Sequence, residues 1–411
     1  MFLRPAARSL FRPAVAARGF ATAGGLNEVV IVSAARTPVG SFGKSLSKLS
    51  AVQLGGTAIR GAIEKAGLKP SDIEEVYMGN VVSANLGQAP ARQAAFAAGC
   101  PESTEATTIN KVCASGAKAV IFAYQNIAMG ARDVMVAGGM ESMSNAPYYF
   151  PRNASFGHQQ ATDSIIKDGL WDVSNQIHMG TCAEETAVEY KISREAQDEH
   201  AVTSYKRAAE AWKNGLFKNE VVPVTIRDKK GDKIIAEDEE YKNIKFDKVS
   251  SLKSPFLKGG SVTAANASTL NDGASALVLM SRAKAEALGI KPLARILSFG
   301  DAATSPKKFT IAPSLSIPIA LKRANLSKDD ISLFEINEAF SVVIRANEQI
   351  LQLDPSKVNI AGGGVSLGHP IGSSGSRILV SLVHLLKPGQ LGVTGVCNGG
   401  GAASSIVIER L

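Results

Sequence analysis

Cys113 is the residue of this sequence whose setting most favours nucleophilic chemistry. It follows a β-branched run at residues 107–109 and precedes apolar residues at helical spacing, which end at Gly130. We therefore expect a strand, a turn and a helix that begins at Cys113. Unpaired backbone N–H groups and the positive end of the helix dipole would favour the thiolate and lower the pKa of this thiol. The alternative, a small buried hydrophobic residue, stays open on this stretch alone.

Three further residues are candidates for the same chemistry. His369 lies in a glycine-rich turn before a second apolar helix, at the position matching Cys113, which favours a functional role over a structural one. Cys397 precedes three glycines between two predicted strands, where exposed backbone N–H groups can bind an oxyanion. A tight hairpin would also explain those glycines. Asn337 follows a predicted strand, and a helix cap is the common role of Asn at such a place.

The elements that would position these residues alternate between strands and helices. Such alternation favours a mostly parallel sheet with helices on both faces. In the first part of the chain we predict strands at 28–34, 76–79, 107–109 and 133–139, and helices at 50–65, 89–98 and from Cys113 onward.

Residues from about 145 to 264 depart from this pattern. They hold both tryptophans, an amphipathic helix from Arg194 to Asn214 and a very polar run from Arg227 to Lys248. A segment of this length and composition is typical of a cap over a site rather than of more sheet.

The part of the chain beyond the cap repeats the part before it. Residues 66–73 align without gaps to residues 324–331, and residues 358–361 resemble the strand that precedes Cys113. We predict two α/β halves, rich in βαβ units, about a pseudo-dyad, with helix N-termini converging on one site. The expected segments are a leader at 1–20, an N-terminal half of 26–144 with 265–290, a cap at 145–264 and a C-terminal half at 291–411.

Composition narrows the class and the compartment. The chain has 411 residues, 45% of them hydrophobic and 20% charged, as in a globular protein, and no apolar run long enough to cross a membrane. Its first twenty residues are amphipathic, basic and free of acid, which predicts a mitochondrial import signal rather than a disordered basic tail. The four arginines of this leader supply half of the formal net charge of +8. The mildly basic remainder does not favour nucleic-acid binding, and it would suit an anionic, phosphate-bearing substrate.

The four cysteines form no CxxC pair, which makes zinc and a disulfide framework improbable. Four motifs resemble those of the thiolase family in order and spacing, and the resemblance runs from about residue 26 to 411. They are Asn110-Lys111-Val112-Cys113-Ala114-Ser115-Gly116, Asn337-Glu338-Ala339-Phe340, Gly368-His369-Pro370-Ile371-Gly372 and Cys397-Asn398-Gly399-Gly400-Gly401.

This resemblance implies the layered α/β/α/β/α thiolase fold and a reversible Claisen condensation of two acetyl-CoA molecules to acetoacetyl-CoA and CoA. It implies that Cys113 carries the acyl group, that His369 accepts the proton of Cys113, and that Cys397 acts as acid and base at the α-carbon. Asn337 would hold a water that, with His369, stabilises the enolate oxygen. The backbone N–H groups of Cys113 and Gly399 would bind the other oxyanion.

The resemblance also implies binding positions for coenzyme A. Tyr205, Lys248 and Ser268 match such positions, whereas Asn243 stands where relatives often carry an arginine near the adenine, so that Lys242 or Lys245 would have to substitute. His178 and Met179 resemble the short-chain branch of the family and would leave room only for a short acyl group.

A potassium site is implied in the same way, formed by Tyr205 and the carbonyls of Ala264, Ala265, Ala267 and Val365. No prosthetic group is expected. A homotetramer in the mitochondrial matrix is expected from the resemblance alone. Two alternatives stay open: a longer-chain 3-ketoacyl-CoA thiolase, and a non-catalytic acyl-CoA or lipid carrier on the same fold.

Overall fold

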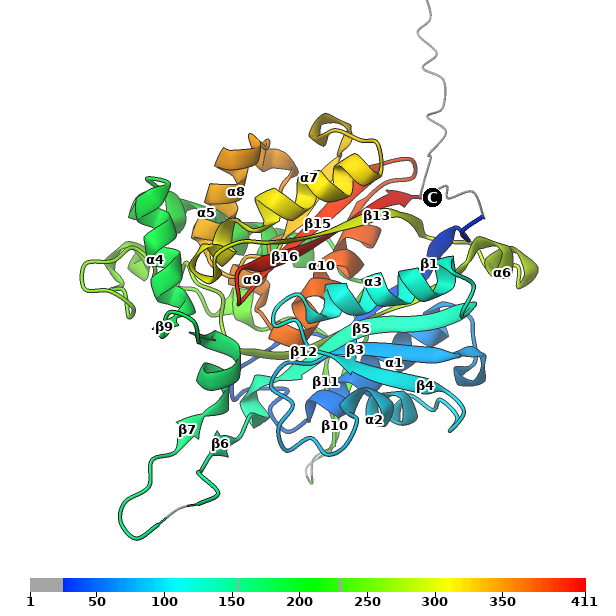
Figure 1. Cartoon of the computed structure of the whole chain (residues 1–411), viewed down its shortest axis with the longest axis horizontal. Helices are drawn as coiled ribbons and strands as arrows, with labels where there is room; N and C mark the ends of the chain where they lie inside the picture. The colour runs from blue at the N-terminus through cyan, green and yellow to red at the C-terminus, as the bar shows by residue number, and fades with distance from the viewer. Residues whose placement is uncertain (1–24, 154, 228, 230) are drawn as a thin grey trace, which may run out of the picture.

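A computed structural model describes residues 25–153, 155–227, 229 and 231–411. The predicted leader, residues 1–20, lies outside the described residues. In the described part of the chain, one large mixed sheet runs through the molecule (Figure 1). Across the sheet the strands are β14 (Leu333–Ile336), β15 (Leu391–Asn398), β16 (Ala402–Arg410), β13 (Ala294–Ala303), β1 (Val29–Arg36), β12 (Asn271–Ser281), β5 (Val134–Ser142), β3 (Glu75–Gly79) and β4 (Glu105–Ile109), with β2 (Gly40–Ser41) beside β12.

The sheet is mixed, so the expectation of a mostly parallel sheet is wrong. Parallel pairing joins β3 to β4 and β5, and β14 to β15, whereas β1, β12, β13 and β16 pair antiparallel with their neighbours. The reason lies in the connections. A tight turn joins β15 to β16, and the long excursion after β5 returns the chain as β12 beside β5 without a crossover helix.

Helices divide the molecule into five layers, as Figure 1 shows. One core lies between the N-terminal strands and the helices α1 and α2, and another lies between the C-terminal strands and α7 and α8. The third core surrounds α3 and α10. These helices pack together between the two half-sheets, which are the N-terminal strands β1, β12, β5, β3 and β4 and the C-terminal strands β13, β16, β15 and β14. The helices are α1 (Ala51–Lys65), α2 (Pro90–Ala97), α3 (Ser115–Ala128), α6 (Arg282–Ala287), α7 (Pro313–Arg323), α8 (Ser341–Leu351), α9 (Gly364–Leu367) and α10 (Ile371–Leu385), with short 3₁₀ turns at Pro70–Asp72, Met143–Asn145, Pro306–Ile311, Lys328–Asp330 and Pro355–Lys357.

The two halves repeat each other closely. The matched segments 66–73 and 324–331 both form a 3₁₀ turn between a helix and a parallel strand. The first and second halves also share a register shift, at Ser33 in β1 and at Ser298 in β13. Each of these serine hydroxyls donates a 2.6 Å hydrogen bond to a helix carbonyl, that of Ala62 in α1 or Ala320 in α7. The prediction of two similar halves is confirmed. Residues 358–361, expected as a strand, form only isolated bridges, one of them parallel to β14.

The inserted segment is built from short pieces and two longer helices. The predicted helix from Arg194 to Asn214 is confirmed to within one residue. The pieces are β6 (Tyr148–Tyr149), β7 (Thr162–Asp163), a π-helix (Ile165–Leu170), β8 (Trp171–Asp172), β9 (Ile177–His178), α4 (Met179–Glu189), α5 (Arg194–Lys213), β10 (Val224–Ile226), β11 (Lys233–Ile235) and 3₁₀ turns at Glu240–Lys242 and Phe246–Ser251.

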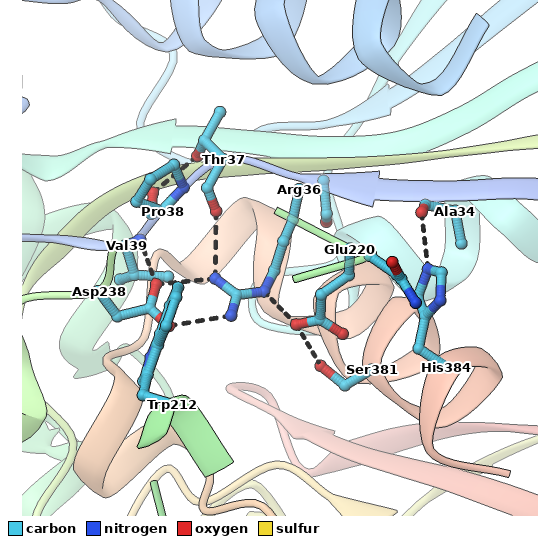
Figure 2. A network of polar contacts seen from close by, with 12 residues as sticks. Ala34, Arg36, Thr37, Pro38, Val39, Trp212, Glu220, Asp238, Ser381 and His384 are labelled. Atoms are coloured by element: carbon cyan, nitrogen blue, oxygen red, sulfur yellow. Dashed lines mark hydrogen bonds and ion pairs between the residues drawn. The ribbon is translucent and has the colours of Figure 1, made fainter. Parts of the chain in front are cut away.

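A fully buried arginine fastens this segment to the sheet. Figure 2 shows Arg36, the last residue of β1, between Glu220 and Asp238 of the insert. Its guanidinium donates two nearly parallel bonds to the Asp238 carboxylate, at 2.7 and 2.9 Å. Such bidentate pairing is strong and directional. The insert is therefore held to the core by charge as well as by apolar contact. No helix in the described ranges is both long and apolar enough to cross a membrane.

Candidate active site

A cavity of about 260 Å³ lies where the two halves and the insert meet. Three of the predicted catalytic residues, Cys113, His369 and Gly399, line it. The other lining residues are Met143, Gly169, Leu170, His178, Met179, Phe256, Ala267, Ser268, Thr269, Leu270, Phe309, Ala339, Phe340 and Ile371. Cys397 and Asn337 are not in this lining and are completely buried.

Cys113 lies in the turn between β4 and α3. The helix begins at Ser115, so the expectation that it begins at Cys113 is wrong by two residues. The cause is the backbone of Val112, whose φ of 47° lies in the left-handed region that a β-branched residue rarely adopts. Two side chains support this turn: the Ser115 hydroxyl donates to the Val112 carbonyl at 2.6 Å, and Asn110 Oδ1 accepts from the Val112 N–H at 3.0 Å.

The thiol of Cys113 is not acidified by this setting. Burial raises its pKa to about 11, although the N–H groups of Gly399 and of Cys113 itself, which point at the sulfur, act in the opposite direction. The predicted lowering is therefore wrong, because the cost of placing a charge in an apolar cavity exceeds the gain from backbone donors. Cys113 is a neutral thiol that needs a base to become a nucleophile.

His369 has the protonation state that such a base requires. Its Nδ1 lies 2.5 Å from the Ser374 hydroxyl oxygen, and this hydroxyl donates to the Pro370 carbonyl at 3.1 Å. Since the hydroxyl hydrogen is used there, Nδ1 carries the imidazole hydrogen and Nε2 keeps a free lone pair. Burial, together with the positive charge of Arg377, lowers the pKa of His369 to about 3. The imidazole is therefore neutral and able to accept a proton.

Asn337 lies beside this imidazole. It follows β14, its N–H donates to the Gly395 carbonyl at 2.8 Å, and its Nδ2 lies 3.5 Å from Nε2 of His369. Helix α8 begins only at Ser341 and is preceded by Phe340, so the alternative of a helix cap for Asn337 is wrong. The amide belongs to the site instead.

Cys397 and Gly399 lie at the end of β15, beside Cys113. Burial raises the pKa of the Cys397 thiol, and a negative charge on Cys113 raises it further. The two thiols are therefore close enough to interact electrostatically. The glycines after Cys397 also serve the turn: Gly401 has a φ of 82°, and a Cβ there would stand 2.5 Å from two carbonyl oxygens. The N–H of Gly399 points at Cys113 as well, so the tight turn and the donor coexist.

The residues proposed to bind coenzyme A fall into two groups. His178 and Met179 lie at the start of α4 in the cavity wall, and His178 stacks on Phe256 with ring centroids 4.9 Å apart. Ser268 lines both the cavity and a more open hollow of about 450 Å³, called the outer hollow below, which also reaches Asn243. The Asn243 side chain donates to the Ser41 hydroxyl at 3.1 Å.

Lys248 is exposed and lines neither the cavity nor the outer hollow, and the same is true of Lys242 and Lys245. Tyr205, in contrast, is buried in α5. Tyr205 packs in one small cluster with Val365. Of the three alanines proposed with them, Ala264 and Ala267 line the outer hollow and Ala265 is buried. Among the described residues no group of three or more His, Cys, Asp or Glu side chains could hold a metal.

Several residues of the site escaped sequence reasoning. Ser374 fixes the tautomer of His369, Asn271 accepts from the His369 N–H at 2.8 Å, and Glu141 is a buried carboxylate behind both catalytic turns. The cavity wall also includes Phe309 and Phe340, whose rings meet edge to face. The only sequence signal for Glu141 was a carboxylate at the end of a strongly apolar strand.

Known proteins share this architecture over nearly the whole chain. The family profile "Thiolase, N-terminal domain" matches residues 29–283, and "Thiolase, C-terminal domain" matches residues 290–410. The chain is 56% identical to acetyl-CoA acetyltransferase, mitochondrial, of Mus musculus, over 96% of this chain and 94% of that protein. It is 57% identical to the protein of the same name from Bos taurus, with the same coverage.

Solved structures agree with this. The Acat5 thiolase of Ascaris suum, crystallised in complex with coenzyme A, superposes with a TM-score of 0.90 at 48% identity, covering 93% of this chain and 100% of that one. The acetyl-CoA acetyltransferase of Bacillus anthracis gives a TM-score of 0.92 at 40% identity, covering 94% and 100%.

Proposed function

The chain belongs to the thiolase family, and from this premise we propose that it is an acetyl-CoA C-acetyltransferase. The reaction joins two acetyl-CoA molecules to give acetoacetyl-CoA and CoA, and runs in reverse as thiolysis. The observation that carries the proposal is that Cys113 and a neutral His369 line one cavity, where the Gly399 N–H points at the Cys113 sulfur and the charge of Cys113 acts on a second thiol, Cys397.

Acylation uses the neutral thiol of Cys113 and the neutral imidazole of His369. The Cys113 sulfur attacks the thioester carbon of the first acetyl-CoA while Nε2 of His369 takes the thiol proton. The carbonyl oxygen becomes negative and accepts from the N–H groups of Cys113 and Gly399. The bond from this carbon to the CoA sulfur breaks, the CoA thiolate receives the proton from His369, and the acetyl group stays on Cys113.

Condensation uses the second thiol. Cys397 removes a proton from the methyl carbon of the second acetyl-CoA, and the resulting carbanion attacks the acyl carbon on Cys113. Asn337, through a water, and His369 stabilise the enolate oxygen of the incoming thioester. Because the Cys397 thiol must lose its own proton to act as this base, that proton passes first to His369. The bond from the acyl carbon to the Cys113 sulfur then breaks, acetoacetyl-CoA leaves, and the Cys113 thiolate takes the proton from His369. A thiol of raised pKa is a strong base once ionised, which suits abstraction from a weakly acidic carbon.

A short acyl group fits the wall of the cavity. His178, Met179 and Phe256 close it on the side of the insert, and Phe309 and Phe340 close it on the side of the C-terminal half. These side chains favour acetyl and acetoacetyl over longer chains. The outer hollow, with Ser268 and Asn243, would take the pantetheine and adenine parts of CoA, and Tyr205 and Lys248 are proposed as further binding residues.

A potassium site and the state of Tyr205 belong to the same proposal. A potassium ion between Tyr205 and the carbonyls of Ala264, Ala265, Ala267 and Val365 would order the outer hollow. The buried phenol of Tyr205 has a pKa raised by burial and by two carboxylates, so it would act as a neutral ligand.

We also propose a homotetramer in the mitochondrial matrix with an import leader at residues 1–20. The names of the relatives support the mitochondrion. The division into an N-terminal half (26–144 with 265–290), a cap (145–264) and a C-terminal half (291–411) is proposed with it.

The deciding experiment is CoA-dependent cleavage of acetoacetyl-CoA by the purified chain, compared with cleavage of a 3-ketoacyl-CoA of eight or more carbons. We expect activity on the short substrate that is lost on alkylation of Cys113. Faster cleavage of the long substrate would favour the longer-chain thiolase, and no cleavage of either would favour the non-catalytic carrier. Equal rates in potassium and sodium would remove the potassium site.

A further inference from the structure

Glu141 is a buried carboxylate that none of the steps above uses. It lies near the end of β5, is only 1% exposed, and accepts four hydrogen bonds without a cationic partner among the described residues. Its Oε1 accepts from Asn80 Nδ2 at 2.8 Å and from the Val82 N–H at 3.3 Å. Its Oε2 accepts from the N–H groups of Val81 and Gly372, each at 3.0 Å.

The bond from Gly372 supplies a cap that α10 lacks. Pro370 precedes this helix and makes no side-chain cap. Its carbonyl accepts from the N–H groups of Ser373 and Ser374, whereas the N–H of Gly372 needs an acceptor from elsewhere. A carboxylate at a helix N-terminus satisfies such donors and interacts favourably with the dipole. Here the cap comes from the other half of the molecule, 231 residues away in sequence. It fixes the start of the helix that His369 precedes by two residues.

The same carboxylate also reaches the turn of the nucleophile. The loop whose N–H groups it holds presents the Val81 carbonyl to Asn110 Nδ2 at 3.3 Å. Asn110 Oδ1 in turn accepts from the N–H of Val112, the residue before Cys113. Hydrogen bonds and short stretches of backbone thus join the two catalytic turns through Glu141.

The backbone around Glu141 leaves no room for another arrangement. A Cβ on Gly372 would stand 2.6 Å from the Met140 carbonyl oxygen and 2.7 Å from Glu141 Oε2. A Cβ on Gly139 would stand 2.0 Å from the Gly372 carbonyl oxygen. The first turn of α10 is therefore pressed against β5 at backbone distance, with the carboxylate as its polar contact.

We infer that Glu141 is a positioning residue, whose carboxylate sets the distance and orientation between Cys113 and His369 by holding both of their turns. The inference rests on the proposed function, because only a proton transfer between these two residues makes their relative placement decisive. A misplacement of about 1 Å at such a pair costs on the order of 10²-fold in rate.

The charge of Glu141 provides an independent readout. Burial raises the pKa of Glu141 itself to about 7, so the group is charged above neutral pH. There its charge raises the pKa of Cys113, and its removal should increase the thiolate fraction. The other ionisable groups facing Cys113 are His369 from the turn before α10, Cys397 from β15 and Lys111 from its own turn. Lys111 is paired with Asp301.

The charged group facing Glu141 itself is Asp272 from β12, which bonds Ser142 and Ser144. None of these partners is altered by the substitution Glu141→Gln.

The test compares Glu141→Gln with Glu184→Gln in the full-length protein. Glu184 is an equally buried carboxylate of α4 that also accepts four bonds, from Ser254, Ser261 and Val262, and touches neither catalytic turn. For E141Q we expect kcat to fall roughly 10²-fold with little change in KM. We also expect alkylation of Cys113 by iodoacetamide, at one fixed pH above neutral, to be faster than in the wild type, because a nearby negative charge is gone. E184Q should lose thermal stability but keep the alkylation profile.

A second variant covers the case in which E141Q does not fold. Asn110 is exposed, so Asn110→Ala should fold. It removes both bonds of this side chain, the one donated to the Val81 carbonyl and the one accepted from the Val112 N–H, and should lower the acylation rate roughly tenfold. Equal kcat in E141Q and E184Q, or alkylation that slows in step with activity, overturns the inference. A wild-type chain without Cys113-dependent thiolysis overturns the proposed function and the inference together, whereas normal wild-type thiolysis with an unaffected E141Q overturns only the inference.

Discussion

The two halves of the molecule use one scaffold for opposite tasks. Each places a reactive residue two positions before a helix between the half-sheets, Cys113 before α3 and His369 before α10. In the N-terminal half the turn contains a left-handed Val112 and gives a thiol that keeps its proton. In the C-terminal half a serine fixes an imidazole that lacks one at the reactive nitrogen. Duplication supplied the positions, and the local contacts made one a proton donor and the other an acceptor.

A second pair of equivalent positions has diverged in charge. Arg36 and Asp301 stand three residues after the register shifts at Ser33 and Ser298. Arg36 is fully buried and holds the insert, whereas Asp301 is half-buried and holds the nucleophile turn through Lys111 and also binds Lys118 on α3. The same place in the strand thus anchors the cap in one half and the catalytic turn in the other.

The largest loss of activity is expected when the thiol of Cys113 is removed. Cys113→Ala leaves His369 without a proton to accept, so no acyl-enzyme should form and thiolysis should fall to the uncatalysed level. Incubation with radiolabelled acetyl-CoA followed by denaturation would measure the adduct. A labelled covalent adduct that persists in this variant would refute the assignment.

Loss of the second thiol should separate the two chemical steps. Cys397→Ala retains Cys113 and His369, so it should still acylate, but condensation should fall by roughly 10²–10⁴-fold for want of a base at the α-carbon. Rapid-quench measurement of acyl-enzyme against acetoacetyl-CoA would show both. Condensation at the wild-type rate would exclude Cys397 from proton abstraction.

Removing the charge of Arg36 and removing that of Asp301 should change the free energy of unfolding by different amounts. Arg36→Met strands two buried carboxylates and should lower the free energy of unfolding by about 3–5 kcal/mol. Asp301→Asn, whose partners are partly exposed, should cost no more than about 1 kcal/mol and instead slow acylation. Urea unfolding of both variants tests this, and equal losses would show that the two positions do not differ as described.

The protonation states predict a pH profile. The pKa of Cys113 is raised to about 11, so below that value the thiolate fraction, and with it the alkylation rate, should rise about tenfold per pH unit. The pKa of His369 is lowered to about 3, so its charge should not change between pH 5 and 9. Burial raises the pKa of Glu141 to about 7, so its ionisation should add only a small downward step near neutral pH to this rise. Alkylation of Cys113 measured over this range that instead levels off below pH 9 would show that the Cys113 pKa is assigned wrongly.

The smallest effect concerns the repeat itself. Ser33→Ala and Ser298→Ala each remove one buried 2.6 Å hydrogen bond at matching positions, so both should cost about 1 kcal/mol, and equally. Thermal unfolding would compare them, with Ser47→Ala as a control of smaller loss, because its hydrogen bond to the Lys44 carbonyl is open to solvent. Unequal losses would show that the halves pack their helices differently at this point.

Sequence reasoning recovered what depends on local pattern. The helix at 50–65, the strand before Cys113 and the repeat of residues 66–73 follow from periodicity, capping residues and short-range alignment. The pairing directions of β12 and β16 did not follow, because they depend on where a distant strand returns to the sheet.

The site shows the same division. The turns of Cys113, His369 and Cys397 could be found from glycine content and spacing, but the pKa of Cys113 was predicted in the wrong direction, because burial by the other half is invisible in the local sequence. The role of Glu141 depends on a contact between residues 141 and 372, which no local pattern encodes.

The position of β12 has a consequence for the order of events during synthesis. This strand lies between β1 and β5 at the centre of the N-terminal half, yet it follows the whole insert in the chain. The first half therefore cannot close until about residue 281 has left the ribosome, whereas residues 294–410 supply every strand of their own half. Because late loop closure slows assembly, we expect the C-terminal half to gain protection first during refolding, which pulse-labelled hydrogen exchange would measure.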